Sequence, residues 1–396
     1  MSIGARTHLF FFALLLPLLV EARGQVGLDV LEARGFDAIA GERVALVVNH
    51  TARNADGKHI IDLLLDGKKA TVVRIFTPEH GLTGLSDEAV ADSTYRNVPV
   101  VSLYGKEKKP KPELLTDVDA VVFDVQDVGA RYYTYPATLA YTLEAAKAAG
   151  KKVIVLDRPN PAGGSVVAGF VPPVELTGKF TSLYSIPTRH GMTIGELARL
   201  FNDHFGIGAT LEVVAMSGWT RTMLWQDTGL PWVPPSPNLK SPDAALIYAG
   251  MGWIETTNIS VGRGTEAPFF LYGAPFIDGT KWAAALKKAL PAGVSAAPAT
   301  FTPADKLHRH FGKECGGVRL TVNDLSADLF AAGLAMLRTL STLFPDFDPT
   351  SDFAISMGKA GIDKRLKNGE TVKKILAEAA ADCKKFKKIR KKYLLY

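Results

Sequence analysis

Two patterns of apolar and polar positions alternate along the chain from residue 41 to about residue 216. Short, almost unbroken runs of Val, Ile, Leu and Phe are typical of strands buried on both faces, and longer stretches with apolar residues at helical spacing are typical of amphipathic helices. The first pattern predicts strands at 43–49, 70–76, 98–104, 119–125, 151–157 and 211–216. The second predicts helices at 57–67, 137–150 and 193–205.

This alternation predicts an α/β fold with a Rossmann-like, mostly parallel sheet that carries helices on both faces. Residues 217–275 are instead rich in Pro, Gly and Trp, and we expect them to form a wall of a binding site rather than a linker. Beyond them the pattern predicts helices at 279–290, 328–344 and 369–393 and a strand at 317–324. We therefore predict a Rossmann-like domain at 25–275, which carries the candidate site, and a smaller α+β auxiliary domain at 276–396.

The first 24 residues have the composition of a secretory signal peptide. Arg6 precedes an apolar run from Leu9 to Val20, and the small residues Ala22 and Gly24 follow it. We expect cleavage near Gln25, export to the periplasm or the extracellular space, and no transmembrane span in the mature chain. An uncleaved N-terminal anchor stays open as the alternative.

The charge of the chain is concentrated near its end. The formal net charge is +6, and the stretch 383–393 holds seven Lys or Arg and no acid, so the rest of the chain carries 6 − 7 = −1. Two interpretations of this basic run stay open: contact with an anionic envelope polymer, or the solvated face of a terminal helix. The balanced remainder gives no reason to expect a nucleic-acid partner.

Motifs for dinucleotide binding, phosphate-loop chemistry and serine-hydrolase chemistry are missing. No G-x-G-x-x-G opens a helix after the first strand, and there is no Walker A loop and no G-x-S-x-G elbow. Cys315 and Cys383 are the only cysteines, without a C-x-x-C pair or an HExxH stretch. We therefore expect no dinucleotide cofactor and no zinc site, and pairing of the two cysteines stays open.

Polar residues follow four of the predicted strands. They are Asn49, His50 and Thr51, then Glu79 and His80, then Asp124, Gln126, Asp127 and Arg131, and finally Asp157 and Arg158. The carboxyl ends of parallel strands share one edge of a sheet, where ligands bind in α/β folds. Helix caps and turns also explain Asn49 or Asp157, but they explain the Glu79 and Asp127 clusters poorly.

Blocks in order along the chain resemble one family of bacterial enzymes. They include "TPEHG", "VFDVQDVGARYYTY", "VLDRPNPAGG", "IPTRHGMTIGELARLFN", "DTGLPWVPPSPNL" and "TNISVGRGTEAPF". From about Gly27 to Tyr396 the chain resembles the NamZ-type exo-β-N-acetylmuramidases. The resemblance implies removal of a terminal N-acetylmuramic acid from the non-reducing end of peptidoglycan fragments, with sugars or muropeptides as partners. It also implies that no cofactor and no metal are needed, and that the catalytic glutamate lies in the "PEHG" motif, here Glu79.

The chain departs from the family pattern at two positions. Thr83 stands where relatives often have the arginine of "PEHGxRG", and Val261 stands where they often have the glutamate of "SEGRG". These departures leave open an alternative function, a non-catalytic muropeptide-binding or surface-attachment protein on the same fold.

Glycosidic cleavage usually needs two carboxyl groups. We expect Glu79 to be the acid and Asp127 to be its partner, with Glu255 as the other candidate. A third route, in which the N-acetyl group of the substrate attacks, stays open.

The lactyl carboxylate of muramic acid favours an arginine receptor, and aromatic rings favour the apolar face of a sugar. The substrate-binding candidates are Arg131, Arg189 and Arg263, with His190 as a weaker one, the aromatic residues Tyr132, Tyr133, Tyr135 and Trp253, and further Asn49, His80, Asp124 and Asn258.

Overall fold

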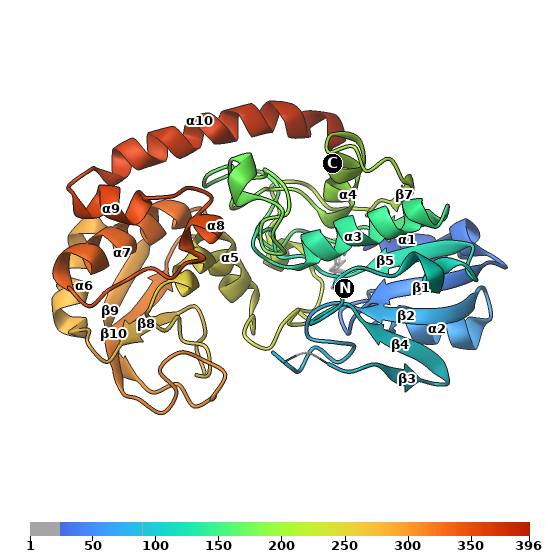
Figure 1. Cartoon of the computed structure of the whole chain (residues 1–396), viewed down its shortest axis with the longest axis horizontal. Coiled ribbons are helices and arrows are strands. Elements are labelled where there is room, and N and C mark those ends of the chain that lie inside the picture. The colour runs from blue at the N-terminus through green and yellow to red at the C-terminus, as the bar shows by residue number, and fades with distance from the viewer. Residues whose placement is uncertain (1–23, 89) are drawn as a thin grey trace, which may run out of the picture.

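The computed structural model describes residues 24–88 and 90–396, and almost all of the predicted signal peptide lies outside these ranges. Two regions lie side by side, one around a seven-stranded sheet and one around a three-stranded sheet (Figure 1).

The larger sheet has the strand order β3-β4-β2-β1-β5-β6-β7. Its parallel strands are β1 (Arg43–Val48), β2 (Thr71–Thr77), β4 (Val98–Ser102), β5 (Ala120–Asp124), β6 (Lys152–Leu156) and β7 (Thr210–Val214). The edge strand β3 (Ser93–Tyr95) runs antiparallel to β4 and was not predicted, because three partly exposed residues carry no apolar pattern. The predicted mostly parallel sheet is confirmed.

Helices cover both faces of this sheet. Alternate residues of β1 belong to two separate hydrophobic cores, one on each face. The core that contains Val47 includes residues of α3 (Tyr135–Ala148) and α4 (Ile194–Asp203). The core that contains Leu46 includes residues of α1 (Gly27–Ala33) and α2 (Ile60–Gly67). A strand buried on both faces reads as a continuous apolar run, which explains why the strands were recognisable.

The smaller sheet is antiparallel, with the order β8-β10-β9. It contains β8 (Leu271–Ala274), β9 (Val294–Phe301) and β10 (Cys315–Val322), and the helices around it are α5 (Pro242–Met251), α6 (Gly279–Ala289), α7 (Leu329–Leu343), α8 (Phe353–Met357) and α9 (Ile362–Lys367). The predicted α+β character is confirmed. The division at residue 275 stays a prediction, although β8 precedes it and pairs with β10.

Five elements of this region were not predicted, among them the short helices α8 and α9, which have five and six residues. α5 is buried on almost every side, so its apolar residues show no helical period, and it lies in the segment that we expected to be irregular. β8 has only four residues, and β9 is rich in Ala and contains Pro298, which are poor strand formers.

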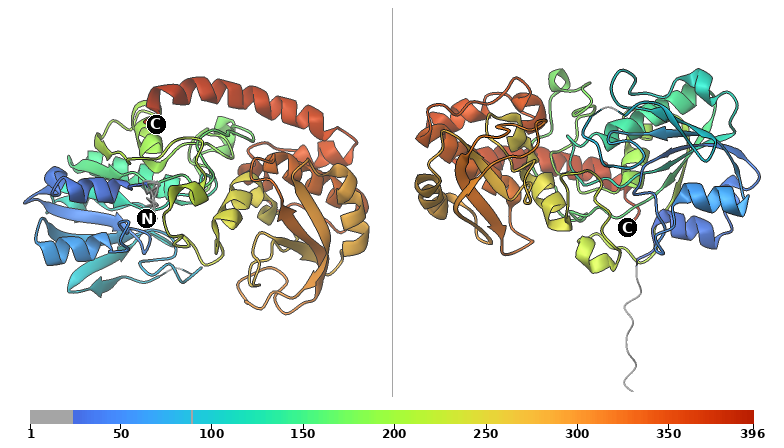
Figure 2. Two further views of the ribbon diagram at one scale, coloured as in Figure 1. Left: turned by 180° about the vertical axis from the view of Figure 1, so that it is seen from behind. Right: turned by 90° about the horizontal axis from the view of Figure 1, so that it is seen from below.

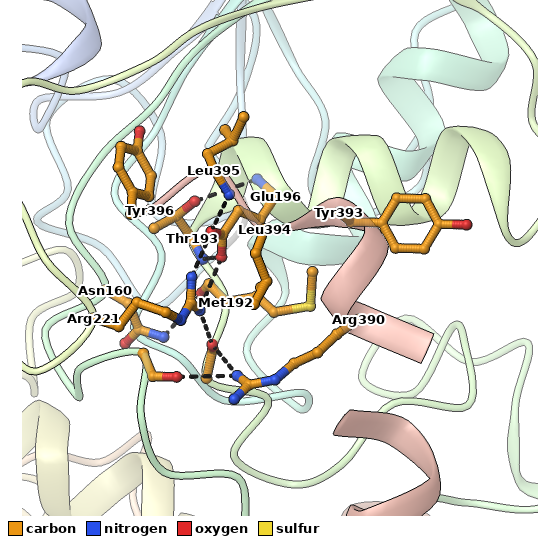
Figure 3. A network of polar contacts seen from close by, with 12 residues as sticks. Asn160, Met192, Thr193, Glu196, Arg221, Arg390, Tyr393, Leu394, Leu395 and Tyr396 are labelled. Carbon is orange, nitrogen blue, oxygen red and sulfur yellow. Dashed lines mark hydrogen bonds and ion pairs between the residues drawn. The ribbon is translucent and has the colours of Figure 1, made fainter. Parts of the chain in front are cut away.

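The long helix α10 (Val372–Arg390) leads from the smaller region back to the larger one (Figures 1 and 2). Figure 3 shows how the chain end is held there. The backbone N–H of Leu395 donates to Glu196 (2.9 Å), whose carboxylate also pairs with Arg221 (2.6 Å), and Arg390 donates to the carbonyl of Gly164 (3.0 Å). The last residues therefore connect the two regions.

The predicted basic run is divided by this arrangement. Arg390 is buried, whereas the other basic side chains are exposed: Lys384, Lys385, Lys387, Lys388, Lys391 and Lys392. Most of the run is thus a solvated face of α10 and of the short turn after it, and contact with an anionic polymer stays an open interpretation. Cys315 and Cys383 are both free and buried, so they form no disulfide. Within the described ranges, no helix has the length and apolar character that a membrane span requires.

Candidate active site

A cavity of about 360 Å³ is lined by residues of both regions. Its acidic and basic lining residues are Glu79, His80, Asp87, Glu255, Arg263 and His308. The first three follow β2 of the larger sheet, and the last three come from segments near the smaller sheet. A partly closed cavity with several converging polar groups is the usual form of an active site.

Glu79 stands just beyond the end of β2. Pro78 fixes its own φ and holds Thr77 extended, so the strand is carried stiffly to the glutamate. The Glu79 side chain is partly buried, and its Oε2 accepts a hydrogen bond from the Thr134 hydroxyl (2.6 Å). Burial and the nearby Glu79 carboxylate raise the pKa of Tyr104, so that hydroxyl keeps its proton at neutral pH.

The backbone turns sharply directly after Glu79. His80 has φ +72° and Gly81 has φ +68°, so both lie in the left-handed region, which is costly for a residue with a side chain. The turn places the His80 ring against its own loop, where Nδ1 is 2.7 Å from the Ser86 carbonyl and 3.3 Å from Asp87 Oδ1. Both neighbours are acceptors, so Nδ1 carries the hydrogen and Nε2 is the free nitrogen.

Glu255 and Arg263 form an ion pair on another side of the cavity. The guanidinium approaches Glu255 Oε2 through Nε (3.0 Å) and Nη2 (2.9 Å) and lies over the Phe269 ring. Burial lowers the pKa of Arg263, but the charges of Glu255 and Asp87 outweigh it, so the pKa lies above its ordinary value. The two side chains are about one quarter exposed, so they are accessible from the cavity.

Asp87 and His308 join the two regions at the cavity and were missed by the sequence analysis. His308 Nε2 lies 3.4 Å from Asp87 Oδ2, and the Asn238 amide donates to the same oxygen (2.8 Å). Burial raises the pKa of Asp87, but the His308 hydrogen bond and the charges of Arg263 and His80 outweigh it, so the pKa is lowered. Asp87 could have been found from its place in the loop after "PEHG"; no sequence pattern marks His308.

Tyr132 and Tyr133 lie in the cavity wall, as we expected for sugar-binding aromatics. Their hydroxyls donate to the carbonyls of Tyr248 and Pro235, and both rings pack edge-on against the Tyr248 ring, at centroid distances of 5.2 and 6.0 Å. The other two aromatic candidates, Tyr135 and Trp253, are fully buried core residues outside the lining. The expectation that they stack on a sugar is therefore corrected.

Six candidates lie together at the carboxyl edge of the larger sheet but outside the cavity lining: Asn49, Asp124, Asp127, Arg131, Arg189 and His190. We call them the buried polar cluster. Their positions after parallel strands correctly predicted that these polar side chains gather at one edge of the sheet. The positions did not predict that the chain covers these side chains, since all six are at most 5% exposed.

The acids and amide of the buried polar cluster have partners within the chain. Asp124 pairs with the guanidinium of Arg158. Asp127 Oδ2 accepts from the Gly129 N–H (2.8 Å) and lies 3.3 Å from His190 Nε2. Asn49 donates to the Tyr135 hydroxyl (3.0 Å). This placement corrects the expectation that Asp127 stands beside Glu79 in the site.

The two arginines of the buried polar cluster are engaged with backbone carbonyls. Arg131 donates to the carbonyls of Ile355 (2.9 Å) and Ser356 (2.7 Å), and Arg189 donates to the carbonyl of Ala162. Burial lowers the pKa of each to about 10. Among the three arginines proposed for a lactyl carboxylate, Arg263 is the one that the structure brings to the cavity.

The remaining predicted positions lie away from the lining. Asn258 bridges two backbone segments, donating to the Asp346 carbonyl (2.7 Å) and accepting from the Asp348 N–H (3.0 Å). Val261 is buried, and Thr83 lines a separate surface groove. Neither Thr83 nor Val261 is part of the cavity lining in this chain.

Comparison with known proteins gives consistent results. Residues 44–243 match the family model for the N-terminal part of the exo-beta-N-acetylmuramidase NamZ, and residues 246–396 match the model for its C-terminal part. The chain is 42% identical over 382 residues to the peptidoglycan beta-N-acetylmuramidase NamZ of Bacillus subtilis (strain 168), covering 94% of this chain and 91% of that protein.

Two solved structures have the same fold. Both are DUF1343 family proteins of Bacteroides fragilis NCTC 9343. The first has a TM-score of 0.86 at 31% identity and covers 94% of this chain and 99% of its own. The second has a TM-score of 0.77 at 29% identity, with 95% and 99% covered.

Proposed function

The chain belongs to the exo-β-N-acetylmuramidase NamZ family, and on that premise we propose that its cavity hydrolyses the bond that links a terminal N-acetylmuramic acid to the rest of a peptidoglycan fragment. The observation that carries this proposal is the presence of two accessible carboxyl groups, Glu79 and Glu255, in the same cavity. Two carboxyl groups flanking the scissile bond are the usual apparatus of a glycoside hydrolase.

Glu79 acts as the general acid that protonates the leaving oxygen. Its position on a stiff strand end and the hydrogen bond from Thr134 fix the carboxyl group, which is what proton transfer in a transition state requires. Glu255 is the second carboxyl group. Its ion pair with Arg263 fixes its position, where it can either stabilise positive charge at the anomeric carbon or activate a water molecule.

Arg263 is the receptor for the lactyl carboxylate that distinguishes muramic acid from glucosamine. Its guanidinium contacts Glu255 through Nε and Nη2, which leaves hydrogens on Nη1 for a ligand. Tyr132, Tyr133 and Tyr248 supply the aromatic wall for the apolar face of the sugar.

Export completes the proposal, because peptidoglycan lies outside the cytoplasmic membrane. It is supported by the signal-peptide composition of residues 1–24. The intact mass of the secreted protein tests this step: cleavage near Gln25 is expected, and a secreted chain that retains Met1 would contradict it.

The activity is tested by incubating the chain with a MurNAc–GlcNAc disaccharide and measuring both free sugars. We expect release by the wild type and a loss of about 10²- to 10⁴-fold in kcat for Glu79→Gln. The matched control is Glu88→Gln, an exposed carboxylate of the same loop, which should keep full turnover. Wild-type binding without release of sugars would support the non-catalytic alternative instead.

The stereochemistry of the first product shows whether Glu255 acts at the anomeric carbon or activates a water molecule. Carboxyl groups about 5 Å apart give retention, and groups about 6.5–9.5 Å apart give inversion with Glu255 as base. Anomer-resolved NMR of the released sugar during the first turnovers distinguishes these results. Retention that survives Glu255→Gln would favour attack by the substrate's own N-acetyl group.

A further inference from the structure

The charges of the cavity do not balance once an anionic sugar enters. With Glu79 holding the proton that it donates, the lining carries two carboxylates, Glu255 and Asp87, and one guanidinium, Arg263. Glu255 already balances the charge of Arg263 through their ion pair. The lactyl carboxylate of muramic acid would therefore add a second negative charge beside Asp87, in a partly desolvated site where such repulsion is strong.

Two imidazoles stand where a positive charge is needed. Asp87 lies between them, with Oδ1 3.3 Å from His80 Nδ1 and Oδ2 3.4 Å from His308 Nε2. All three side chains are at most 16% exposed, and all three line the cavity. We call them the His80–Asp87–His308 trio.

His308 is the better placed of the two imidazoles to take up a proton. Its Nε2 faces two carboxylates, since Asp305 Oδ2 lies 3.5 Å away in addition to Asp87. Both are acceptors, so Nε2 carries the hydrogen and Nδ1 is the nitrogen open to protonation. His80 Nδ1 faces one carboxylate, Asp87, because its other partner is the neutral Ser86 carbonyl.

On the basis of the proposed function, we propose that His308 is a specificity-determining residue, which takes up a proton from solvent when the carboxylate of N-acetylmuramic acid enters the cavity. The resulting imidazolium balances the ligand's charge together with Arg263. A neutral sugar such as N-acetylglucosamine brings no charge and draws no proton. The site thus selects a substrate that bears a carboxylate through coupled binding of a proton.

The other ionisable groups around the trio are consistent with this assignment. They are Glu79, Glu255 and Arg263 in the lining, Asp305 beside His308, and the nearby side chains Tyr104 and His50. The lowered pKa of Asp87 keeps it ionised at neutral pH, and Tyr104 keeps its proton because its pKa is raised. Burial lowers the pKa of His50, whose Nε2 contacts the Pro234 carbonyl, so it stays neutral.

Calorimetry of the full mature chain tests the proposal directly. N-acetylmuramic acid is titrated into the wild type near neutral pH in two buffers that differ in ionisation enthalpy, and N-acetylglucosamine is the neutral probe. We expect uptake of roughly half a proton to one proton with the acid and none with the neutral sugar. The Kd for the acid should rise by up to about tenfold per pH unit as the pH increases through the range where imidazoles titrate.

His308→Gln should abolish most of the proton uptake, and His310→Gln is the matched control. His310 belongs to the same loop but contacts the Asn258 carbonyl (2.8 Å) outside the cavity lining, so uptake should persist. The wild-type titration alone keeps the proposal falsifiable if His308→Gln does not fold.

Three results would overturn the inference: binding of N-acetylmuramic acid without proton uptake, equal uptake with N-acetylglucosamine, or uptake that persists in folded His308→Gln. A wild type that neither binds N-acetylmuramic acid nor cleaves the disaccharide would overturn the proposed function, and this inference with it.

Discussion

The cavity and the buried polar cluster contain the same kinds of residue but differ in how many hydrogen-bond and charge partners the chain supplies to them. In the buried polar cluster, Asp124 has the guanidinium of Arg158 and Arg131 has two backbone carbonyls, and all six side chains are at most 5% exposed. In the cavity, Glu79 and the Glu255–Arg263 pair are partly exposed and keep lone pairs or hydrogens free.

This difference separates structural from functional polar groups. A buried charge is tolerated when the chain supplies its partner, and Asp124 and Arg131 hold segments of the chain together in this way. A group whose remaining capacity faces a cavity can be completed by a ligand instead. Position at the carboxyl edge of the sheet is shared by both sets and does not distinguish them.

The largest expected effect on stability is that of Arg158→Met. This change leaves the fully buried Asp124 carboxylate without its counter-charge, so the free energy of unfolding should fall by about 3–5 kcal/mol. Denaturant unfolding measures the loss, and turnover per folded molecule should stay near the wild-type value. A stable variant with impaired turnover would break the distinction between the two regions.

The pH dependence of stability gives the second test. Burial raises the pKa of Asp157 to about 6, although hydrogen bonds from Thr193, Gly195 and Tyr396 act in the opposite direction. The native state therefore keeps this proton where the unfolded chain, with a pKa near the ordinary 3.8, has released it. The contribution of Asp157 is full below about pH 4 and is lost as the pH rises through about 6.

Asp157→Asn removes this titration. Relative to the variant, the wild type should lose up to about 3 kcal/mol of unfolding free energy between about pH 4 and pH 7, at 1.36 kcal/mol per pKa unit. Denaturant titrations of both proteins across that range measure the difference. Parallel stability profiles would show that Asp157 does not hold a shifted proton.

A smaller effect is expected for Arg263→Lys in the cavity. Lysine keeps the charge but loses the planar fork that serves Glu255 and the substrate carboxylate together, so kcat/KM should fall about ten- to hundredfold, mostly through KM. Arg309→Lys, an exposed change in the loop of His308, is the control and should leave both constants unchanged. A normal KM in Arg263→Lys would remove Arg263 from the substrate-binding site.

The larger sheet was predictable because its strands are buried on both faces. Val44 to Val48 lie in two cores at once, and such strands are marked by composition alone. Glu79 was predictable for a related reason, since a carboxylate directly after an apolar strand and a proline has a defined place in space. The smaller region was less predictable, because α5 and β9 lack a clear period.

The other half of the cavity depends on contacts between distant parts of the chain. Asp87 meets His308, 221 residues further along, and nothing in either local sequence indicates that contact. Asp127 was favoured over Glu255 because it follows a strand, β5, of the same sheet as β2, although β1 lies between the two strands. Sequence could not show that the loops beyond that edge cover Asp127, while the segment after α5 carries Glu255 into the cavity.

Matched replacement of these two carboxylates tests the central claim most directly. Glu255→Gln and Asp127→Asn each exchange one carboxylate for its amide, and turnover of the MurNAc–GlcNAc disaccharide is measured per folded molecule. We predict a loss of about 10²-fold or more in kcat for Glu255→Gln, and near-normal turnover with reduced stability for Asp127→Asn. Near-normal turnover in Glu255→Gln together with loss of turnover in folded Asp127→Asn would contradict the account.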